Sequence, residues 1–519
     1  MRLPGVGMGF DTTVSEIRPP QARDAPPMVL PAELFPEPIS FKQIVFVVMT
    51  IGFLAAAIPA TFRFRWMEKV CIAGILFMTI NPVDVTFFSY TNYRGDIRGI
   101  EFGVTDWLVI TLIVTMQYAP RWRNRRRYYR QPNEVPMALY LGWCILSIGT
   151  ATIPQFAFFG VTRILRAYAL FWVAYNWLRD EDDLRFVVWC VVGLTFYSFW
   201  QVLMDKYMRG VFPPRGSFDH QNSLVTFQNI LNFIIFAVLL GDTDKVFDRR
   251  TLIYWGALGA GALTSVATLS RGGMATMVLG FMLITPVMLW LKQPPRKRGK
   301  KFGAIGVMGL AALPALAVVL PQIVKRFETA PEASAHARDL FNEVAQEMGQ
   351  NHFFGVGLNN YSLGSGYIPK FRDLLPPIDH GGLAHHIYWL HYAELGIVGV
   401  SLWVLMMTSF ILILLRFVLR RRDGPERVFA VGVLTAFCIA MLIGTLEWNW
   451  RQTQLMLTYM MFGGFACALP RLEKARAREH RRRRELAAWL LARQQQTAVK
   501  SFGAREPPET DSGVAAGRR

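Results

Sequence analysis

The sequence predicts an all-α fold, a polytopic bundle of about 12–13 transmembrane helices with one long loop outside the membrane. Hydrophobic residues fill 52% of the 519 positions, and apolar runs of roughly 17–25 residues recur along most of the chain. Short loops crowded with arginine alternate with loops that carry arginine, histidine and asparagine motifs. Because basic short loops mark the cytoplasmic face, this alternation predicts that the motifs face outward.

Each expected helix is one apolar run that ends at charged residues, glycine or proline. Together these runs account for most of the chain and leave a single long gap between the last helices. In order, the expected spans are residues 41–60, 70–90, 104–119, 136–152, 159–178, 186–207, 223–240, 251–270, 273–291, 302–321, 388–419, 428–445 and 453–469.

These spans divide the chain into three regions. Residues 1–40 are rich in proline and mixed in charge, which predicts irregular structure. Residues 41–469 form the expected transmembrane catalytic domain, with residues 322–387 as its large outside loop. Residues 470–519 form a basic tail. No cleavable signal peptide precedes Phe41, so we expect the first span to remain as an anchor.

The positive charge is concentrated in a few segments of the chain. The formal net charge is +19, and no nucleic-acid motif accompanies it, so we attribute it to anionic membrane lipids. The basic loops are residues 121–130, 292–301 and 419–427, followed by the tail. Counting spans between them places all four on one side, the cytoplasm. The five cysteines lie in or beside apolar runs without metal-ligand spacing, which indicates neither a metal site nor a disulfide framework.

Two outside segments carry arginines suited to an anion. Arg271 stands at the junction of two apolar runs in SRGG (270–273), and its planar guanidinium can bind phosphate oxygens in pairs. The alternative is an arginine that reaches to the membrane interface. Arg215 begins RGSFDHQN (215–222), whose alternative reading is an ordinary solvated loop. Arg163 and Arg166 lie three residues apart on one helical face and either extend the same positive site or serve packing.

A histidine pair precedes the span at 388–419. His385 or His386 can take a proton from a hydroxyl near neutral pH. A metal site is the competing reading, because His380 and His391 lie nearby, although no zincin-like spacing appears. Glu394 is expected within the helix, either orienting a histidine or in a structural hydrogen bond.

Three further segments have simpler readings. Residues 332–348 predict an amphipathic helix that lies on the membrane surface or caps a cavity. GVG at 355–357 is read as a turn, with a phosphate cradle as the alternative. DEDD at 180–183 resembles a nucleotide-sugar motif, but it precedes an apolar run, which favours the start of a helix.

The ordered motifs between residues 215 and 399 resemble those of the O-antigen ligase and polymerase superfamily. RGSFDHQN is similar to its R-x-G-x-F-x-x-x-N segment with one residue fewer, and SRGG to its SRG/SRA signature. Residues 338–357 resemble its R…GxG region, and LAHHIYWLHYAELGIVG (383–399) its H-N-x-x-L…E-L-G-x-x-G element. The chain departs from the pattern at His386, where asparagine is usual, and lacks the usual proline before GxG.

This resemblance implies a GT-C-like membrane glycosyltransferase in the bacterial inner membrane, with its active site facing the periplasm. It implies a polyprenyl-diphosphate-linked glycan as donor, a glycan or lipid A-core acceptor, inversion of the anomeric centre, and no metal or other cofactor. Arg215 and Arg271 would bind the diphosphate, and His385 would deprotonate the acceptor. The supporting candidates are Arg166, Arg338, Asn222, His386 and Glu394.

Other functions remain open at this stage. A transporter or lipid-linked glycan flippase predicts two related halves and broken helices near the membrane midplane, and no internal repeat is visible. An assembly scaffold would explain the basic tail but not the ordered motifs. Between polymerase and ligase we favour polymerase, because a phosphorylated lipid A core calls for a basic pocket and the cations of the outside loop are offset by carboxylates. Those cations are Lys325, Arg326, Arg338, Lys370 and Arg372, against Glu328, Glu332, Asp339, Glu343, Glu347, Asp373 and Asp379.

Overall fold

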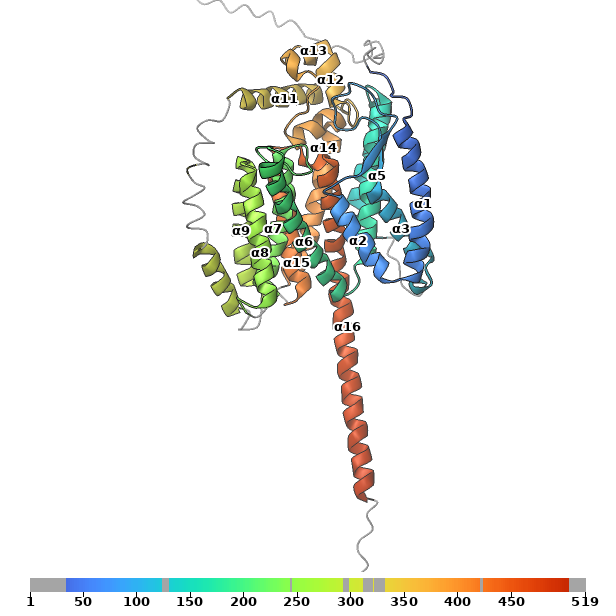
Figure 1. The fold of residues 1–519 in the computed structure, drawn as a ribbon, viewed down its shortest axis with the longest axis vertical. Coiled ribbons are helices and arrows are strands. Elements are labelled where there is room, and N and C mark those ends of the chain that lie inside the picture. The colour runs from blue at the N-terminus through green and yellow to red at the C-terminus, as the bar shows by residue number, and fades with distance from the viewer. Residues whose placement is uncertain are drawn as a thin grey trace, which may run out of the picture.

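A computed structural model shows a bundle of long helices, which confirms the predicted fold class (Figure 1). It describes residues 34–123, 130–242, 245–292, 298–310, 321, 332–420 and 423–503. Within these ranges, eight helices are long and apolar enough to cross a membrane. They are α1 (Phe41–Arg63), α5 (Pro154–Trp177), α6 (Glu181–Leu203), α7 (Gln221–Gly241), α9 (Arg271–Trp290), α14 (Ile387–Val418), α15 (Pro425–Ile443) and α16 (Thr453–Gly503).

Shorter helices complete the bundle and cover one end of it. Those of the bundle are α2 (Trp66–Met78), α3 (Val104–Tyr118), α4 (Glu134–Thr150) and α8 (Arg249–Ala267). Those of the outside loop are α11 (Glu332–Asn351), α12 (Tyr361–Tyr367) and α13 (Pro369–Arg372). Single turns lie at η1 (Pro120–Trp122), η2 (Met204–Met208), η3 (Pro377–Asp379) and η4 (Asn449–Arg451).

The expected span at residues 70–90 is wrong in its second half. Helix α2 ends at Met78, and the chain then forms β1 (Asp84–Phe87), which pairs antiparallel with β2 (Ile100–Gly103). Pro82, between the two elements, lacks the N–H that a continuing helix would use. The expected span at 302–321 lies mostly outside the described residues, although residues 298–310 are helical.

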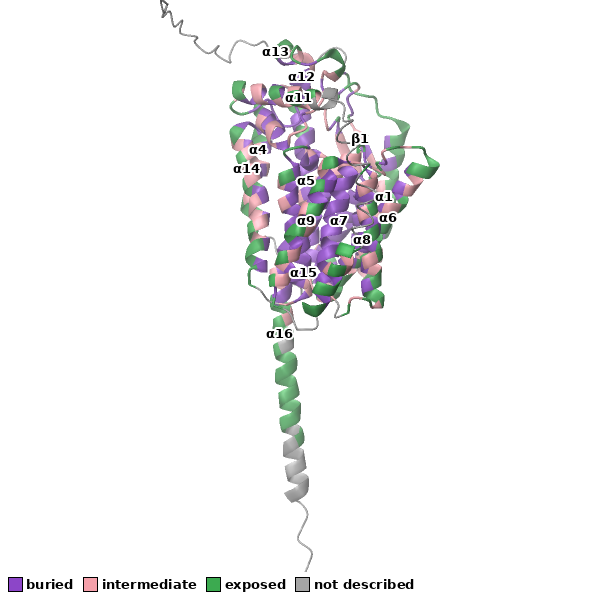
Figure 2. Ribbon diagram, turned by 90° about the vertical axis from the view of Figure 1, so that its left-hand side faces the viewer, coloured by how far each residue is buried: buried purple, intermediate pink, exposed green. Residues whose placement is uncertain are grey.

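Helix α7 is the centre of the bundle. Every residue from Ser223 to Gly241 is buried, and α8, α9 and α15 pack around it (Figure 2). Its polar side chains face neighbouring helices, since Asn229 Nδ2 donates to Gly273 O at 2.8 Å and Asn232 Nδ2 to Ser265 Oγ at 3.2 Å. Such interhelical hydrogen bonds join helices where lipid offers no alternative partner.

Residues of two sequence motifs have structural roles in helix packing and helix capping. A Cβ on Gly273 would lie 2.3 Å from Val225 Cγ1, so this glycine of SRGG allows α9 to approach α7. At 180–183 the reading as a helix start is confirmed, because the Asp180 side chain accepts from Asp183 N at 2.9 Å and caps α6.

The two ends of the bundle differ in charge. At one end, which we call the basic end, Arg121 Nε donates to Glu68 Oε1 at 2.7 Å and Arg427 Nη1 to Glu473 Oε1 at 2.7 Å. Helix α16 leaves the bundle there without a break at residue 470. Helices α11, α12 and α13 cover the opposite end, which we call the motif end (Figure 1). The described basic loops and the motifs therefore lie at opposite ends, as the alternation along the chain predicts.

Candidate functional site

Three polar side chains from distant parts of the sequence meet at the motif end around Glu447. Asn222 Nδ2 donates to Glu447 Oε1 at 2.6 Å, and Arg338 Nη2 lies 3.2 Å from the same oxygen. His385 Nδ1 lies 3.5 Å from the other oxygen, Oε2. We call Asn222, Arg338, His385 and Glu447 the Glu447 cluster. Three of its members are predicted site residues, and the structure brings them together through a carboxylate that the motifs did not indicate.

Backbone contacts between α14 and α15 place His385 beside Glu447. His385 lies two residues before α14, and Ile387 N donates to Gly444 O at 2.9 Å, just after α15 ends. The Tyr388 hydroxyl also donates to Met441 O, at 2.8 Å. The start of one membrane helix is thus fixed to the end of another. The His385 side chain stays 28% exposed, so its neighbours cover the imidazole only in part.

Helix α11 carries Arg338 into the cluster. The predicted amphipathic pattern is confirmed, because Phe341, Val344 and Met348 are buried on one face, and this face packs on α14. The Tyr361 hydroxyl donates to Phe341 O at 2.8 Å and holds the helix in place. The helix lies across the motif end of the bundle (Figure 1).

The SRGG motif meets the end of α15. Ser270 caps α9 by accepting from Gly273 N at 3.2 Å, so the helix begins at Arg271. A Cβ on Gly272 would lie 3.3 Å from Ile443 and 3.6 Å from Leu446, the residue before Glu447. Arg271 therefore begins its helix close to the Glu447 cluster, and its side chain is exposed.

Arg215 lies in a rigid loop of its own. Asp205 Oδ2 accepts from Arg215 N at 3.1 Å and from Gly216 N at 2.7 Å, and Arg215 Nη1 donates to Asp219 O at 3.3 Å. Gln454 Nε2 donates to Ser217 O at 3.2 Å and anchors this loop to α16. The guanidinium is exposed at the motif end, and its described hydrogen bonds remain within the loop.

The remaining histidines have separate structural roles. His386 caps α14, since its Nδ1 accepts from Trp389 N at 3.4 Å, and burial lowers the pKa of His386, which favours this neutral acceptor form. His391 Nε2 lies 2.9 Å from the Tyr140 hydroxyl, and His380 Nε2 lies 3.1 Å from Leu375 O. In the described part of the chain, no three His, Cys, Asp or Glu side chains are placed to share a metal ion.

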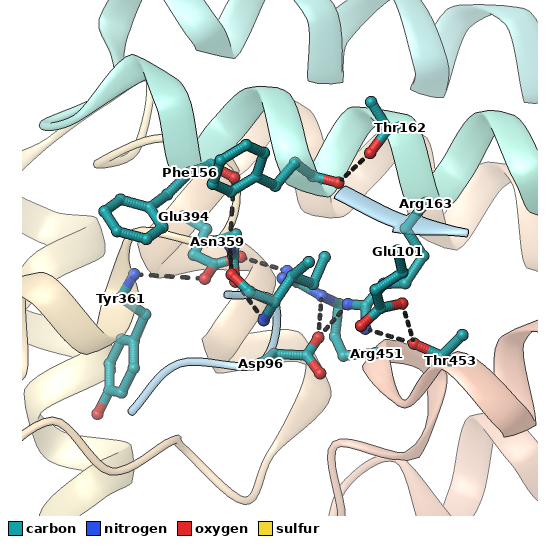
Figure 3. A network of polar contacts seen from close by, with 12 residues as sticks. Asp96, Glu101, Phe156, Thr162, Arg163, Asn359, Tyr361, Glu394, Arg451 and Thr453 are labelled. Atoms are coloured by element: carbon teal, nitrogen blue, oxygen red, sulfur yellow. Dashed lines mark hydrogen bonds and ion pairs between the residues drawn. The ribbon is translucent and has the colours of Figure 1, made fainter. Parts of the chain in front are cut away.

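A second set of charges is buried and includes Arg451, four residues after Glu447 in the sequence (Figure 3). Asp96 pairs with Arg163 and lies 3.6 Å from Arg451 Nε, and Arg451 in turn pairs with Glu394. We call Asp96, Arg163, Glu394 and Arg451 the Asp96 network. Burial alone would lower the pKa of Arg451, but the facing Glu394 and Asp96 carboxylates raise it above its ordinary value. This arrangement is a closed ion network, since each charge faces an opposite one.

Two supporting candidates lie in structural contacts, which is the alternative that the sequence offers for each. Glu394 Oε1 accepts from Tyr361 N at 3.3 Å while its other oxygen faces Arg451, so it does not orient His385. Arg166 lies 2.8 Å from Asp106 and 3.2 Å from both Asp84 and Glu101. Three carboxylates neutralise this guanidinium, which therefore does not extend a positive site. Burial raises the pKa of Asp84 and of Glu101 despite this cation.

The GVG segment is structural, as the turn reading predicts. Gly355 N donates to His352 O at 2.8 Å, Val356 N to Ala393 O at 2.9 Å and Gly357 N to Glu394 O at 2.9 Å. These N–H groups are therefore occupied and cannot cradle a phosphate. Helix α14 is kinked at Gly396 (φ 66°), where a Cβ would lie 2.0 Å from Phe353 O.

The sequence motifs did not indicate Glu447, Asp96 or Arg451. One signal was present, because the five residues 447–451 separate two apolar runs and contain both Glu447 and Arg451. Charged residues in so short a connection between membrane helices cost free energy unless they pair with other polar groups. Residue spacing could not show which partners those are.

A comparison with protein families identifies one match. Residues 256–404 match a family model described as O-antigen ligase. The matched segment contains Arg271, Arg338 and His385, whereas Arg215, Asn222 and Glu447 lie outside it. No curated protein matches the chain. The family match confirms the resemblance to the O-antigen ligase and polymerase superfamily, and with the apolar helices it supports a multi-pass membrane protein of the glycan-transferring kind.

Proposed function

We propose that this chain transfers a polyprenyl-diphosphate-linked glycan to the hydroxyl of an acceptor at the motif end, which faces the periplasm. The observation that carries the proposal is the Glu447 cluster. It places a half-exposed imidazole against a carboxylate at the end of the bundle where Arg271 and Arg215 are also exposed. A base on one side and fixed cations on the other are what glycosyl transfer with a diphosphate leaving group requires.

The proposed step forms a glycosidic C–O bond and an N–H bond, and it breaks the acceptor O–H bond and the bond from the anomeric carbon to the diphosphate. The acceptor oxygen attacks the anomeric carbon, its proton passes to His385 Nε2, and the diphosphate leaves with the electrons of its bond to that carbon. Attack opposite the leaving group inverts the anomeric centre. Arg271 and Arg215 stabilise the charge that develops on the diphosphate. We propose that the reaction needs no metal.

Glu447 is proposed as the positioning residue for this base. With Nδ1–H directed at Glu447, the opposite nitrogen of His385 is the proton acceptor, and the carboxylate stabilises the imidazolium that forms. Asn222 and Arg338 hold Glu447 through its other oxygen at 2.6 and 3.2 Å. The 3.5 Å separation between His385 Nδ1 and Glu447 Oε2 suits a contact that tightens when substrates bind.

A cavity at the motif end favours the polymerase form of this reaction. It measures about 380 Å³ and is lined by four carboxylates, from Glu37, Asp84, Asp96 and Glu101, and by two cations, from Lys42 and Arg98. Its lining is mixed in charge and offers no concentrated positive wall to a phosphorylated lipid A core, whereas sugar hydroxyls can donate hydrogen bonds to its carboxylates. We therefore propose a second lipid-linked glycan as the acceptor.

The kink in α14 is relevant to the alternative of a transporter. Broken helices in transporters leave backbone groups open to the substrate. Here Trp143 Nε1 donates to Leu395 O at 2.9 Å, and the GVG segment donates to the carbonyls of Ala393 and Glu394. Because protein groups occupy the backbone at the break, the kink supports a rigid site better than a transport pathway.

Deletion of the gene tests the function, and analysis of glycans on the carrier lipid is the readout. A polymerase predicts single repeat units left on the carrier. Long chains left on the carrier would show a ligase instead. A normal glycan profile would contradict both forms of the proposal.

Reporter fusions test the orientation separately. Fusions after Arg130 and Lys300 should report cytoplasm, and fusions near Asp219 and Ser334 should report the periplasm. A cytoplasmic signal at Ser334 would place His385 on the wrong side of the membrane for this chemistry.

A further inference from the structure

A large cavity away from the Glu447 cluster lies at the basic end. It measures about 620 Å³ and opens between the corner that joins α1 to α2 and the corner that joins α5 to α6. The first corner contributes the cations Arg63, Arg65 and Lys69, together with Glu68, which pairs with Arg121. The second contributes the carboxylates of Asp180, Asp182 and Asp183, together with Arg179, which lies over the Trp122 ring. The cavity thus has one wall with a net positive charge and one with a net negative charge, and the proposed reaction uses neither.

The charges across this cavity are held apart. Arg65 Nη2 lies 4.0 Å from Asp180 Oδ2, and Lys69 Nζ lies 3.8 Å from Asp183 Oδ1. Both separations exceed hydrogen-bond length. By contrast, Arg121 Nε reaches a carboxylate at 2.7 Å at the same end. The facing walls are therefore close enough to attract each other but leave their hydrogen-bonding capacity largely unused.

The mouth of the cavity lies at the membrane boundary. Helix α1 ends at Arg63, and the next residues, Phe64 and Trp66, are 49% and 59% exposed. Aromatic side chains beside the ends of membrane-spanning helices occupy the headgroup level of the bilayer. Apolar groups that enter this cavity from lipid would therefore pass over Phe64 and Trp66, while polar groups meet the charged walls.

We propose that this cavity binds the headgroup of a phospholipid that carries a primary ammonium group, such as phosphatidylethanolamine. The phosphate lies against Arg63 and Arg65, and the ammonium, on its two-carbon spacer, donates to Asp180 and Asp182. Asp180 Oδ1 caps α6, and its Oδ2, which faces Arg65 at 4.0 Å and so beyond hydrogen-bond length, is the oxygen that accepts from the ammonium. The acyl chains leave along Phe64 and Trp66.

The acidic wall selects among lipids. An anionic headgroup without an amine would bring its negative charge toward Asp180 and Asp182. A trimethylammonium headgroup carries the right charge but has no N–H to donate. Only a headgroup with both a phosphate and a primary ammonium satisfies both walls with charge-assisted hydrogen bonds.

The test uses the full-length protein purified in detergent and titrated with phosphatidylethanolamine, phosphatidylcholine or phosphatidylglycerol of identical acyl chains. Thermal unfolding and native mass spectrometry report stabilisation and retained lipid. We expect phosphatidylethanolamine to raise the unfolding temperature most and to be retained most strongly. Equal stabilisation by phosphatidylglycerol would overturn the proposal, since it would indicate attraction of anionic lipid alone.

Single substitutions in the cavity test where the lipid binds. Asp182→Asn should weaken phosphatidylethanolamine binding about tenfold, because it removes one charge-assisted partner, while phosphatidylglycerol binding stays equal or strengthens. Arg65→Gln should weaken binding of both lipids. Asp373→Asn, at an exposed carboxylate of the motif end, is the matched control and should change neither. Unchanged phosphatidylethanolamine affinity in Asp182→Asn would contradict the assigned site.

Discussion

The Glu447 cluster and the Asp96 network lie at the same end of the molecule, and both are built from arginine and carboxylate side chains. They differ in how far their charged side chains are buried and paired. In the Asp96 network, Arg451 is buried and paired on both sides, by Glu394 and Asp96. In the Glu447 cluster, His385 is 28% exposed and Arg338 is 39% exposed. In the first arrangement each charge faces an opposite one, whereas the second leaves part of an imidazole and part of a guanidinium exposed to a substrate.

The segment 447–451 joins these two regions. Glu447 contacts His385, and Arg451, four residues later, is held inside the Asp96 network. A buried ion network fixes a short turn of backbone, and the turn presents a carboxylate to the reactive histidine. We infer that the Asp96 network, the closed region, fixes the geometry of the Glu447 cluster, the open region. Substitutions in the closed region should therefore lower stability, and substitutions in the open region should lower activity.

The largest expected effects concern activity at the open region. His385→Ala should reduce transfer by about 10²–10⁴-fold, the usual contribution of a general base. Arg271→Ala and Arg215→Ala should each cost about 10²–10³-fold, as loss of a group that stabilises developing negative charge does. Each variant should insert and unfold like the wild type, as measured by transfer assays and denaturation of the purified protein. Full activity of His385→Ala would remove the proposed base.

The next effect concerns stability at the closed region. Arg451→Met leaves Glu394 and Asp96 facing a buried site without their shared cation. Breaking a buried ion pair in this way costs about 3–5 kcal/mol, so the free energy of unfolding in detergent should fall by that order. The control is Arg372→Met, which breaks an exposed ion pair with Asp373. This substitution should change the free energy of unfolding little. A stable Arg451→Met variant that loses only activity would place Arg451 in the open region.

A smaller effect concerns the cap of α14. Burial lowers the pKa of His386, so the unfolded chain binds a proton more readily than the folded one. Stability should therefore fall as pH drops below about 6.5, the ordinary value for histidine. His386→Asn keeps a side chain that caps helices well and does not titrate, so it should remove this part of the pH dependence and leave stability near pH 8 unchanged. If the wild type and His386→Asn lost the same stability between pH 8 and pH 5, the pKa of His386 would not change on folding.

Chelation should have the smallest effect. Treatment of the purified enzyme with EDTA is expected to leave the rate of transfer unchanged, because the proposed reaction uses side chains alone. Loss of activity that added metal restores would contradict this mechanism and assign the histidines to a metal.

Sequence patterns predicted the bundle well because apolar length alone decides whether a helix can cross a bilayer. They failed at residues 79–90, where a proline and the ion pair of Asp84 with Arg166 favour a hairpin over a helix. For the site, the motifs predicted His385, Arg338 and Asn222 but not their shared partner. Glu447 and Glu394 are both single carboxylates beside apolar runs, and only the packing of α14 against α15 determines which one reaches His385.

The most direct test of the account is a double-mutant cycle between His385 and Glu447, with the rate of transfer as the readout. If Glu447 acts by orienting His385, then Glu447→Gln should slow the wild-type enzyme about 10²-fold and should slow His385→Ala hardly at all, because groups that act as one unit are strongly non-additive. An equal further loss in the His385→Ala background would show that Glu447 acts independently, and it would contradict the proposal that the Glu447 cluster positions the base.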